Sequence, residues 1–93
     1  MTMSVLKIFL LRMRGVRAHK SAEIRTKVVG RGTKIWQFAV VGHDVQIGVD
    51  CNIGAHVFIE SGVKIGNRVT IKNGAMLWQG VPIEDDVFVG PGV

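Results

Sequence analysis

The sequence predicts an all-β fold, a parallel β-helix built of hexapeptide repeats. The first observation is that every sixth residue from Val29 to Val89 is Val, Ile or Leu. The second is that a small or β-branched residue stands four positions after each of them, from Thr33 to Val93. The third is glycine directly after the aliphatic residue in many repeats: Gly30, Gly42, Gly48, Gly54, Gly66 and Gly90.

Each repeat is expected to be a short strand followed by a corner. A period of six keeps the aliphatic column on one face of a strand, whereas on a helix with about 3.6 residues per turn it would spread around the surface. Glycine allows a tight corner without a side-chain clash. Three hexapeptides close one coil, so residues eighteen apart stack in three ladders: Val29-Ile47-Ile65-Ile83, Ile35-Ile53-Ile71-Val89 and Val41-Ile59-Leu77.

The length of 93 residues allows one domain. We expect residues 1–17 to be an N-terminal extension, either disordered or capping, and residues 18–93 to form a β-helix of three to four coils. The first coil is less regular, because Ile24 lies five residues before Val29 and Glu23 occupies an apolar position of the column. The pattern stops in mid-coil at Val93, and the open strand edge favours a domain that is truncated at its C-terminus.

The formal net charge of +5 comes from the N-terminal third of the chain. Residues 1–34 hold nine of the twelve Lys and Arg and one acid, whereas residues 35–93 hold three basic residues and six carboxylates. Groove binding needs a basic stripe along the whole domain, so we expect no nucleic-acid partner. The basic segment is compatible with an anionic small molecule such as a nucleotide diphosphate, and equally with a solvated arm.

No targeting or membrane-spanning segment is expected. The apolar run 4–11 is interrupted by Lys7 and is much shorter than the ~20 residues of a transmembrane helix. Its arginines follow the apolar stretch, whereas a secretory signal has its positive charge first. The single cysteine, Cys51, has no partner for an internal disulfide and is expected in the core, so a cytoplasmic location fits the chain.

Several strings resemble one protein family beyond the repeat itself. They are AHKSAEI (18–24), GTKIWQFAVV (32–41), IGVDCNIG (47–54), VKIGNRVTIKNG (63–74) and VPIEDDVFVGPGV (81–93). They resemble the hexapeptide-repeat acyltransferases, and among these the bacterial nucleotide-sugar N-acetyltransferases that act on UDP- or dTDP-linked 3-amino sugars. The resemblance implies a left-handed β-helix, acetyl-CoA as co-substrate, a homotrimer with its active site between subunits, and a role in the synthesis of surface polysaccharide precursors. The alternative is a catalytically inert β-helix fragment that serves as an assembly or folding module.

Acetyl transfer to an amine needs a polar side chain that aims the amine and a base that takes its proton. The resemblance makes Asn73 the candidate aiming residue, although Gly74 stands where the family has a second asparagine. The competing interpretation of Asn73 is a corner residue bonded to nearby backbone. His56 is the candidate base, and its competing interpretation is an exposed turn residue.

A second group of candidates concerns substrate binding. His43, Ser61 and Gln79 are eighteen residues apart, so they form a polar column that is expected to face the sugar. Trp78, beside Gln79, is expected to stack on a base or sugar.

Two further expectations concern assembly and metals. Trp36 and Phe38 are expected to be buried between subunits. We expect no metal site, because His19, His43 and His56 are spaced 24 and 13 residues apart, which fits neither eighteen-residue stacking nor a close pair.

Overall fold

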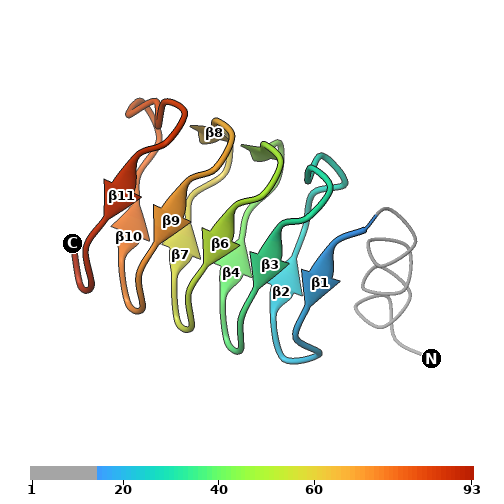
Figure 1. The fold of residues 1–93 in the computed structure, drawn as a ribbon. Helices are drawn as coiled ribbons and strands as arrows, with labels where there is room; N and C mark the ends of the chain where they lie inside the picture. Colours follow the sequence, from blue (N-terminus) through green and yellow to red (C-terminus); the bar gives the residue numbers. More distant parts are fainter. Residues whose placement is uncertain (1–14) are drawn as a thin grey trace.

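The computed structural model describes residues 15–93, and all regular elements in that range are β-strands of two residues each. They are β1 (Arg17–Ala18), β2 (Glu23–Ile24), β3 (Lys34–Ile35), β4 (Val40–Val41), β5 (Gln46–Ile47), β6 (Asn52–Ile53), β7 (Phe58–Ile59), β8 (Lys64–Ile65), β9 (Thr70–Ile71), β10 (Met76–Leu77) and β11 (Phe88–Val89). Figure 1 shows the strands as parts of successive coils stacked along one axis. This part of the chain has no helix long and apolar enough to cross a membrane.

The strands form three faces, named A, B and C. Face A has the order β1-β3-β6-β9-β11, and face B has the order β10-β7-β4-β2. Face C consists of β5 and β8, extended by the isolated bridges Val29–Ile47 and Ile65–Ile83. All pairings are parallel, so each face is a sheet that runs across the coils.

The register confirms the three predicted ladders. On face A, Ile35 pairs with Ile53, and Ile53 pairs with Ile71. The other pairings are Ile71–Val89, Val41–Ile59, Ile59–Leu77, Val29–Ile47, Ile47–Ile65 and Ile65–Ile83. The predicted fold class is therefore confirmed as an all-β parallel solenoid of about four coils, consistent with a left-handed β-helix.

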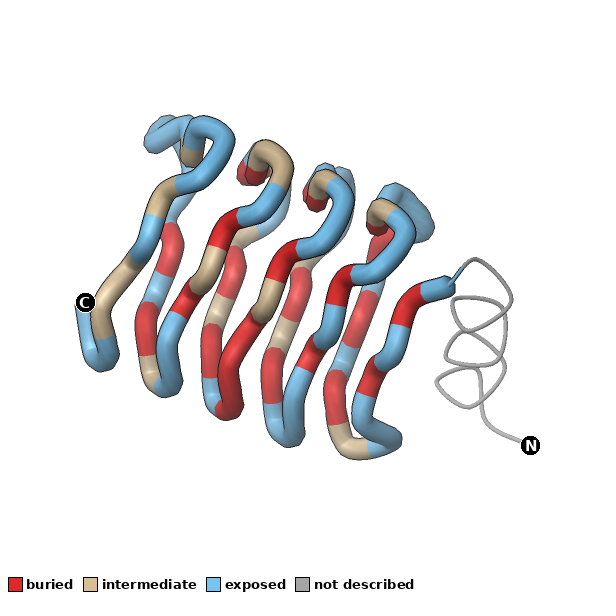
Figure 2. Tube along the Cα trace, in the orientation of Figure 1, coloured by how far each residue is buried: buried red, intermediate tan, exposed pale blue. Residues whose placement is uncertain are grey.

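The core is a column of aliphatic side chains inside the coils. In most strands the first residue faces solvent and the second is buried, which gives the alternation of colours in Figure 2. Ile53 and Ile59, in the middle coils, have no exposed area. Ile83 and Val89, in the last coil, are only partly buried and pack against the same cluster.

The second column of small residues fills the inside of the corners, and Cys51 belongs to it as predicted. The Cys51 thiol is buried and donates a hydrogen bond to the Gly66 carbonyl at 3.1 Å. Burial raises the pKa of this thiol above its ordinary value. Thr33, in the coil before, satisfies its buried hydroxyl by donating to the Gly48 carbonyl at 2.8 Å and accepting from the Cys51 amide at 3.1 Å.

The first coil is one residue shorter than the others. Ala18 pairs with Ile35 and Ile24 pairs with Val41, so these partners are seventeen residues apart. Thr26 closes the shortened corner, because its buried hydroxyl donates to the Val45 carbonyl at 2.7 Å. The predicted irregularity of the first coil is confirmed: Glu23, at the position that a strict period of six would make apolar, is exposed, and Ile24 takes the inward position.

The first coil includes residues just before Ala18. Val16 is buried and Arg17 is part of β1, so both belong to the first coil. The remainder of the expected extension, residues 1–14, lies outside the described residues.

Candidate functional site

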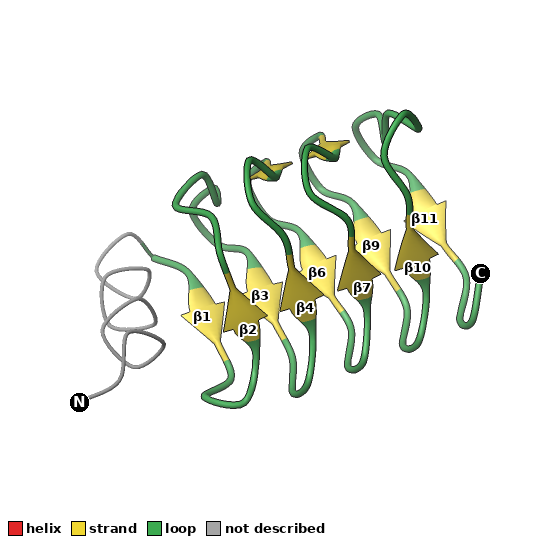
Figure 3. Cartoon of the chain, turned by 180° about the vertical axis from the view of Figure 1, so that it is seen from behind, coloured by secondary structure: helices red, strands yellow, loops and turns green. Residues whose placement is uncertain are grey.

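The side chains with possible chemistry lie at the corners, which Figure 3 shows as loops between the strands. The AB corner, between faces A and B, comprises residues 36–38, 54–56, 72–74 and 90–92; the BC corner comprises 42–44, 60–62 and 78–80; the CA corner comprises 30–32, 48–50, 66–68 and 84–86. Most third corner residues have positive φ, which for Phe38, Asp44, Asp50, His56, Arg68 and Asp86 lies between 55° and 62°.

One hydrogen bond recurs at all three corners. The middle residue of a corner uses its side-chain oxygen to accept the backbone N–H of the residue one coil earlier: Ser61 from His43 at 3.1 Å, Asn67 from Val49 at 2.9 Å, Asn73 from Ala55 at 3.0 Å and Asp85 from Asn67 at 2.8 Å. A Cβ at the glycine before each donor would meet the accepting side chain: Gly42 with Ser61, Gly48 with Asn67, Gly54 with Asn73 and Gly66 with Asp85. The glycine column therefore leaves room for the next coil's side chain.

Asn73 is thus bound into the scaffold through its carbonyl oxygen. The Oδ1 atom accepts from the Ala55 amide, as the corresponding atom of Asn67 does from Val49. The competing interpretation of Asn73 as a corner residue describes this oxygen correctly. The exposed side-chain NH₂ is the group it can offer to a substrate, so the amide acts there as a hydrogen-bond donor.

His56 lies at the same AB corner, one coil before Asn73. Its ring is exposed and stacks on the Phe38 ring, with 5.1 Å between the ring centroids and 29° between the planes. Ala55, the residue that donates to Asn73, directly precedes it. The structure therefore brings the two predicted catalytic residues to neighbouring coils of one corner.

The predicted substrate-binding residues lie at the BC corner. The backbone N–H of His43 donates to the Ser61 hydroxyl oxygen, and the Gln79 backbone N–H donates to a Glu60 carboxylate oxygen. Trp78 is 55% exposed and packs on Phe58 of face B, with ring centroids 5.5 Å apart and an angle of 53°.

The five predicted site residues consequently form two groups. His56 and Asn73 lie where face B begins, and His43, Trp78 and Gln79 lie where it ends. Face B separates the groups within one chain, so a single site that uses both requires contributions from neighbouring subunits.

Sequence reasoning missed a hollow on face A beside the AB corner. Its volume is about 300 Å³, and its lining residues are Trp36, Gln37, Asn52, Gly54, Ala55, Ile71, Lys72 and Asn73. The sequence does contain a signal for this hollow. Trp36, Gly54 and Lys72 are eighteen residues apart and stack, and a glycine between two long side chains leaves a gap. Asn73 is the predicted site residue that borders this hollow.

Among residues 15–93, no group of three or more His, Cys, Asp and Glu is arranged to hold a metal ion. His43 lies at the BC corner, whereas His56 lies at the AB corner. His19 follows β1 and hydrogen bonds to Ser21 through Nδ1 at 2.7 Å.

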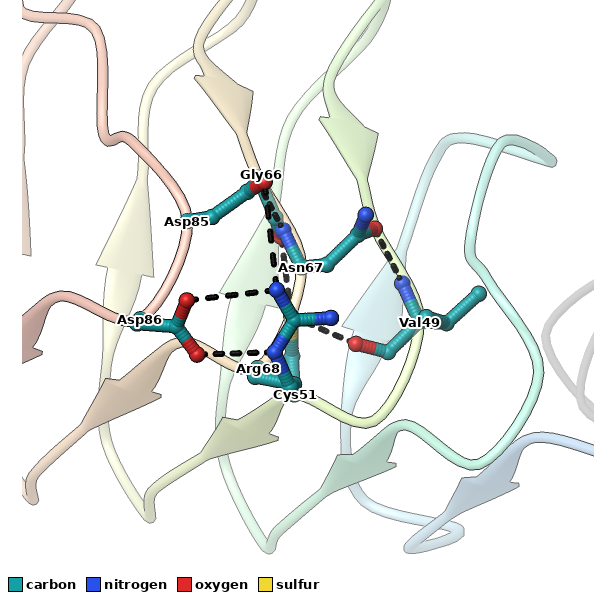
Figure 4. Close-up of polar contacts among 7 residues, drawn as sticks. All are labelled: Val49, Cys51, Gly66, Asn67, Arg68, Asp85 and Asp86. Carbon is teal, nitrogen blue, oxygen red and sulfur yellow. Dashed lines mark hydrogen bonds and ion pairs between the residues drawn. The ribbon is translucent and has the colours of Figure 1, made fainter.

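A salt bridge crosses two coils at the CA corner (Figure 4). Arg68 binds Asp86 through Nε at 2.7 Å and through Nη2 at 3.2 Å. The hydrogen bond from Arg68 lowers the pKa of the Asp86 carboxyl below its ordinary value. The charge triplet 84–86 is therefore bound to the preceding coil at its last two residues, since Asp85 accepts from the Asn67 amide.

Because the folded pKa of Asp86 is lowered, the pair stabilises the fold above the ordinary aspartate pKa of about 3.9 and ceases to do so as the pH falls through the lower folded value. We expect Asp86→Asn to lower the melting temperature at pH 6 by no more than a few degrees, since exposed ion pairs contribute little. The difference should shrink as the pH is lowered toward 2. Asparagine tolerates the positive φ at this position.

Circular dichroism melts of both proteins between pH 2 and pH 7 measure this difference. Asp44→Asn, at the corresponding position of the BC corner, is the control. A difference that is equally large at both ends of the pH range would mean that the carboxylate acts through something other than its charge.

Two family models match the chain over these coils. The bacterial transferase hexapeptide model, which describes six repeats, matches residues 26–61. The model for the hexapeptide repeat of succinyl-transferase matches residues 44–79. A search of curated proteins found no match. Residues 26–79 are therefore similar to the hexapeptide repeats that these two transferase models describe.

Proposed function

We propose that the chain is an acyltransferase that moves an acetyl group from acetyl-CoA to the amino group of a nucleotide-linked amino sugar. The observation that carries the proposal is the match of residues 26–79 to transferase hexapeptide repeats. The finer choice of a UDP- or dTDP-linked 3-amino sugar, and of surface polysaccharide synthesis in the cytoplasm, is supported by the resemblance of the strings at 32–41 and 81–93.

The reaction needs little from the protein. The amine nitrogen attacks the thioester carbonyl carbon and forms the C–N bond of a tetrahedral intermediate. When this intermediate collapses, the C–S bond breaks and sulfur leaves as the thiolate of CoA. His56 is proposed to accept the proton that the amine loses. The NH₂ group of Asn73 is proposed to donate to the carbonyl oxygen while it carries negative charge, because its own carbonyl is occupied by Ala55.

A homotrimer is part of this proposal. Face B exposes Met76 and Trp78 beside Phe58, and an apolar surface of this kind is suited to burial against another subunit. Such burial would let the AB corner of one subunit approach the BC corner of another. The expected burial of Trp36 and Phe38 between subunits stays a prediction, and Trp36 lies on face A.

The test is an acetyl-transfer assay in which a thiol-reactive dye detects released CoA, with a panel of UDP- and dTDP-linked amino sugars. We expect turnover in the parent and a loss on the order of 10²-fold in kcat for His56→Asn. Asparagine tolerates the positive φ of this position but cannot act as the base. Light scattering on the same samples measures the trimer.

Asp50→Asn is the matched control, since it changes a corner residue with the same backbone conformation at the CA corner. It should retain parental activity. If His56→Asn is as active as the parent, His56 is not the base; if the parent shows no turnover with any sugar, the acetyltransferase proposal fails.

The second candidate function is an inert β-helix module for assembly or folding. The observation that favours it is the shared role of Asn73 and Asn67, whose carbonyls stabilise equivalent corners. An inactive chain that still forms the trimer would support this candidate.

A further inference from the structure

The outward residues of face A differ in charge from the rest of the molecule. They alternate with the buried ladder residues and form two columns: Arg17, Lys34, Asn52, Thr70 and Phe88, followed two positions later by His19, Trp36, Gly54, Lys72 and Gly90. Three of these residues are Lys or Arg, and none is an acid. All seven carboxylates of the chain lie on face B or at the BC and CA corners. Face A is therefore a basic strip with no internal neutralising charge.

Trp36 stands in the middle of this strip as a fixed aromatic plate. Its indole Nε1–H donates to the side-chain oxygen Oδ1 of Asn52 at 2.8 Å, which holds the ring against the next coil. The side chain remains 46% exposed, so part of the ring is open to a ligand. Aromatic surfaces held in this way stack on planar rings at low entropic cost.

A hollow opens on each side of Trp36. The hollow of about 300 Å³ extends from Trp36 over Gly54 to Lys72 and Asn73. The other, of about 810 Å³, has Arg17, His19 and Lys34 among its lining residues. Both volumes are in or near the range of small-molecule sites, about 300 to 1,000 Å³.

We infer that face A binds the nucleoside diphosphate part of a ligand, with the base stacked on Trp36 and the diphosphate paired with Lys72. Asn73, the proposed donor to the thioester carbonyl, lines the same hollow beside Lys72. Lys34 and Arg17 add to the positive potential that attracts the ligand. A neutral ligand would leave this potential unused, and an acidic protein partner would not require the hollow.

This site deepens the proposed function, since a nucleotide-linked sugar and CoA both contain a nucleoside diphosphate. The inference is nevertheless tested by nucleotide binding alone and does not require catalytic turnover. UDP and ADP therefore distinguish the two sources of the same chemistry, the acceptor and the acetyl donor respectively.

The experiment compares the 93-residue chain with Trp78→Phe, which leaves Trp36 as the single tryptophan, and with Trp36→Phe, which leaves Trp78. We expect UDP or ADP to quench the Trp36 fluorescence with saturation, inorganic pyrophosphate to displace the nucleotide, and uridine or adenosine to bind at least tenfold more weakly. Raising the salt concentration should weaken nucleotide binding.

Lys72→Gln should weaken the binding of the quenching nucleotide at least tenfold. Lys64→Gln is the matched control, because Lys64 is an exposed lysine on face C, and it should change the affinity less than twofold. Circular dichroism of each variant establishes that the coils are intact.

Three outcomes overturn the inference: no quenching at millimolar nucleotide in folded protein, equal effects of the two lysine substitutions, or tighter binding of a single-stranded RNA oligonucleotide than of either nucleotide. Failure of the proposed function is distinguishable. Saturable nucleotide binding without acetyl transfer would support the site on face A and contradict the acetyltransferase proposal. Acetyl transfer without quenching would support the acetyltransferase proposal and contradict the site.

Discussion

Ile53→Asp is expected to unfold the β-helix at room temperature. Ile53 has no exposed area and pairs with Ile35 in the coil before and with Ile71 in the coil after. The substitution removes an aliphatic contact and places a carboxylate where no water reaches it, which together cost about 5 kcal/mol. Small domains are stable by about 5 to 15 kcal/mol, so this cost approaches the whole stability.

Circular dichroism and thermal melting measure the effect. Gln46→Asp is the matched control, because Gln46 is the outward residue of β5 and is exposed. The control should melt close to the parent. An Ile53→Asp protein that melts within a few degrees of the parent would show that Ile53 does not face the interior.

Gly48→Ala is expected to destabilise the fold by about 2 kcal/mol, in the range of overpacked sites. The new Cβ would meet the side-chain oxygen of Asn67 and the backbone of Gly66 in the next coil. The Asn67 side chain would have to move, and the hydrogen bond it accepts from the Val49 amide would be lost. The backbone conformation at this position is compatible with alanine, since Gly48 does not have positive φ.

Gly90→Ala tests the same position of the repeat without a following coil. Its nearest heavy atom to an added Cβ is the Val93 Cγ2 at 3.7 Å, an ordinary contact. Urea unfolding of both variants gives the comparison. Equal free energies of unfolding would mean that glycine is needed for the backbone of the corner, and that room for the next coil plays no part.

The ladders were predictable because the period of six determines both which side of a strand a residue faces and which residues stack between coils. Within a strand, six is even and keeps each aliphatic residue on one side; between coils, eighteen residues bring the next member of the ladder to the same place. The first coil does not follow the period of eighteen, because one of its corners is a residue shorter. The Thr26 hydroxyl closes that corner by donating to the carbonyl of Val45, nineteen residues later.

The glycines after the ladder residues were recognised correctly as corner residues but for an incomplete reason. Gly42, Gly48, Gly54 and Gly66 do not have positive φ; left-handed conformation occurs two residues later, for example at Asp44 and His56. What requires glycine is the side chain of the next coil, such as Ser61 over Gly42. This contact joins residues nineteen positions apart, so the sequence of a single turn does not predict it.

The sequence by itself determined the strands, the inward residues and the stacking of the coils, because the same position of every hexapeptide is apolar and is therefore buried in every repeat. Only the tertiary structure decided which contacts the outward side chains make. It stacks His56 on Phe38, holds the Asn73 side-chain oxygen on the Ala55 amide, and leaves a hollow between Trp36 and Lys72 on face A. The physical reason is that winding into three faces separates residues close in sequence and aligns residues a full coil apart, so the charge and shape of each face are properties of the folded chain.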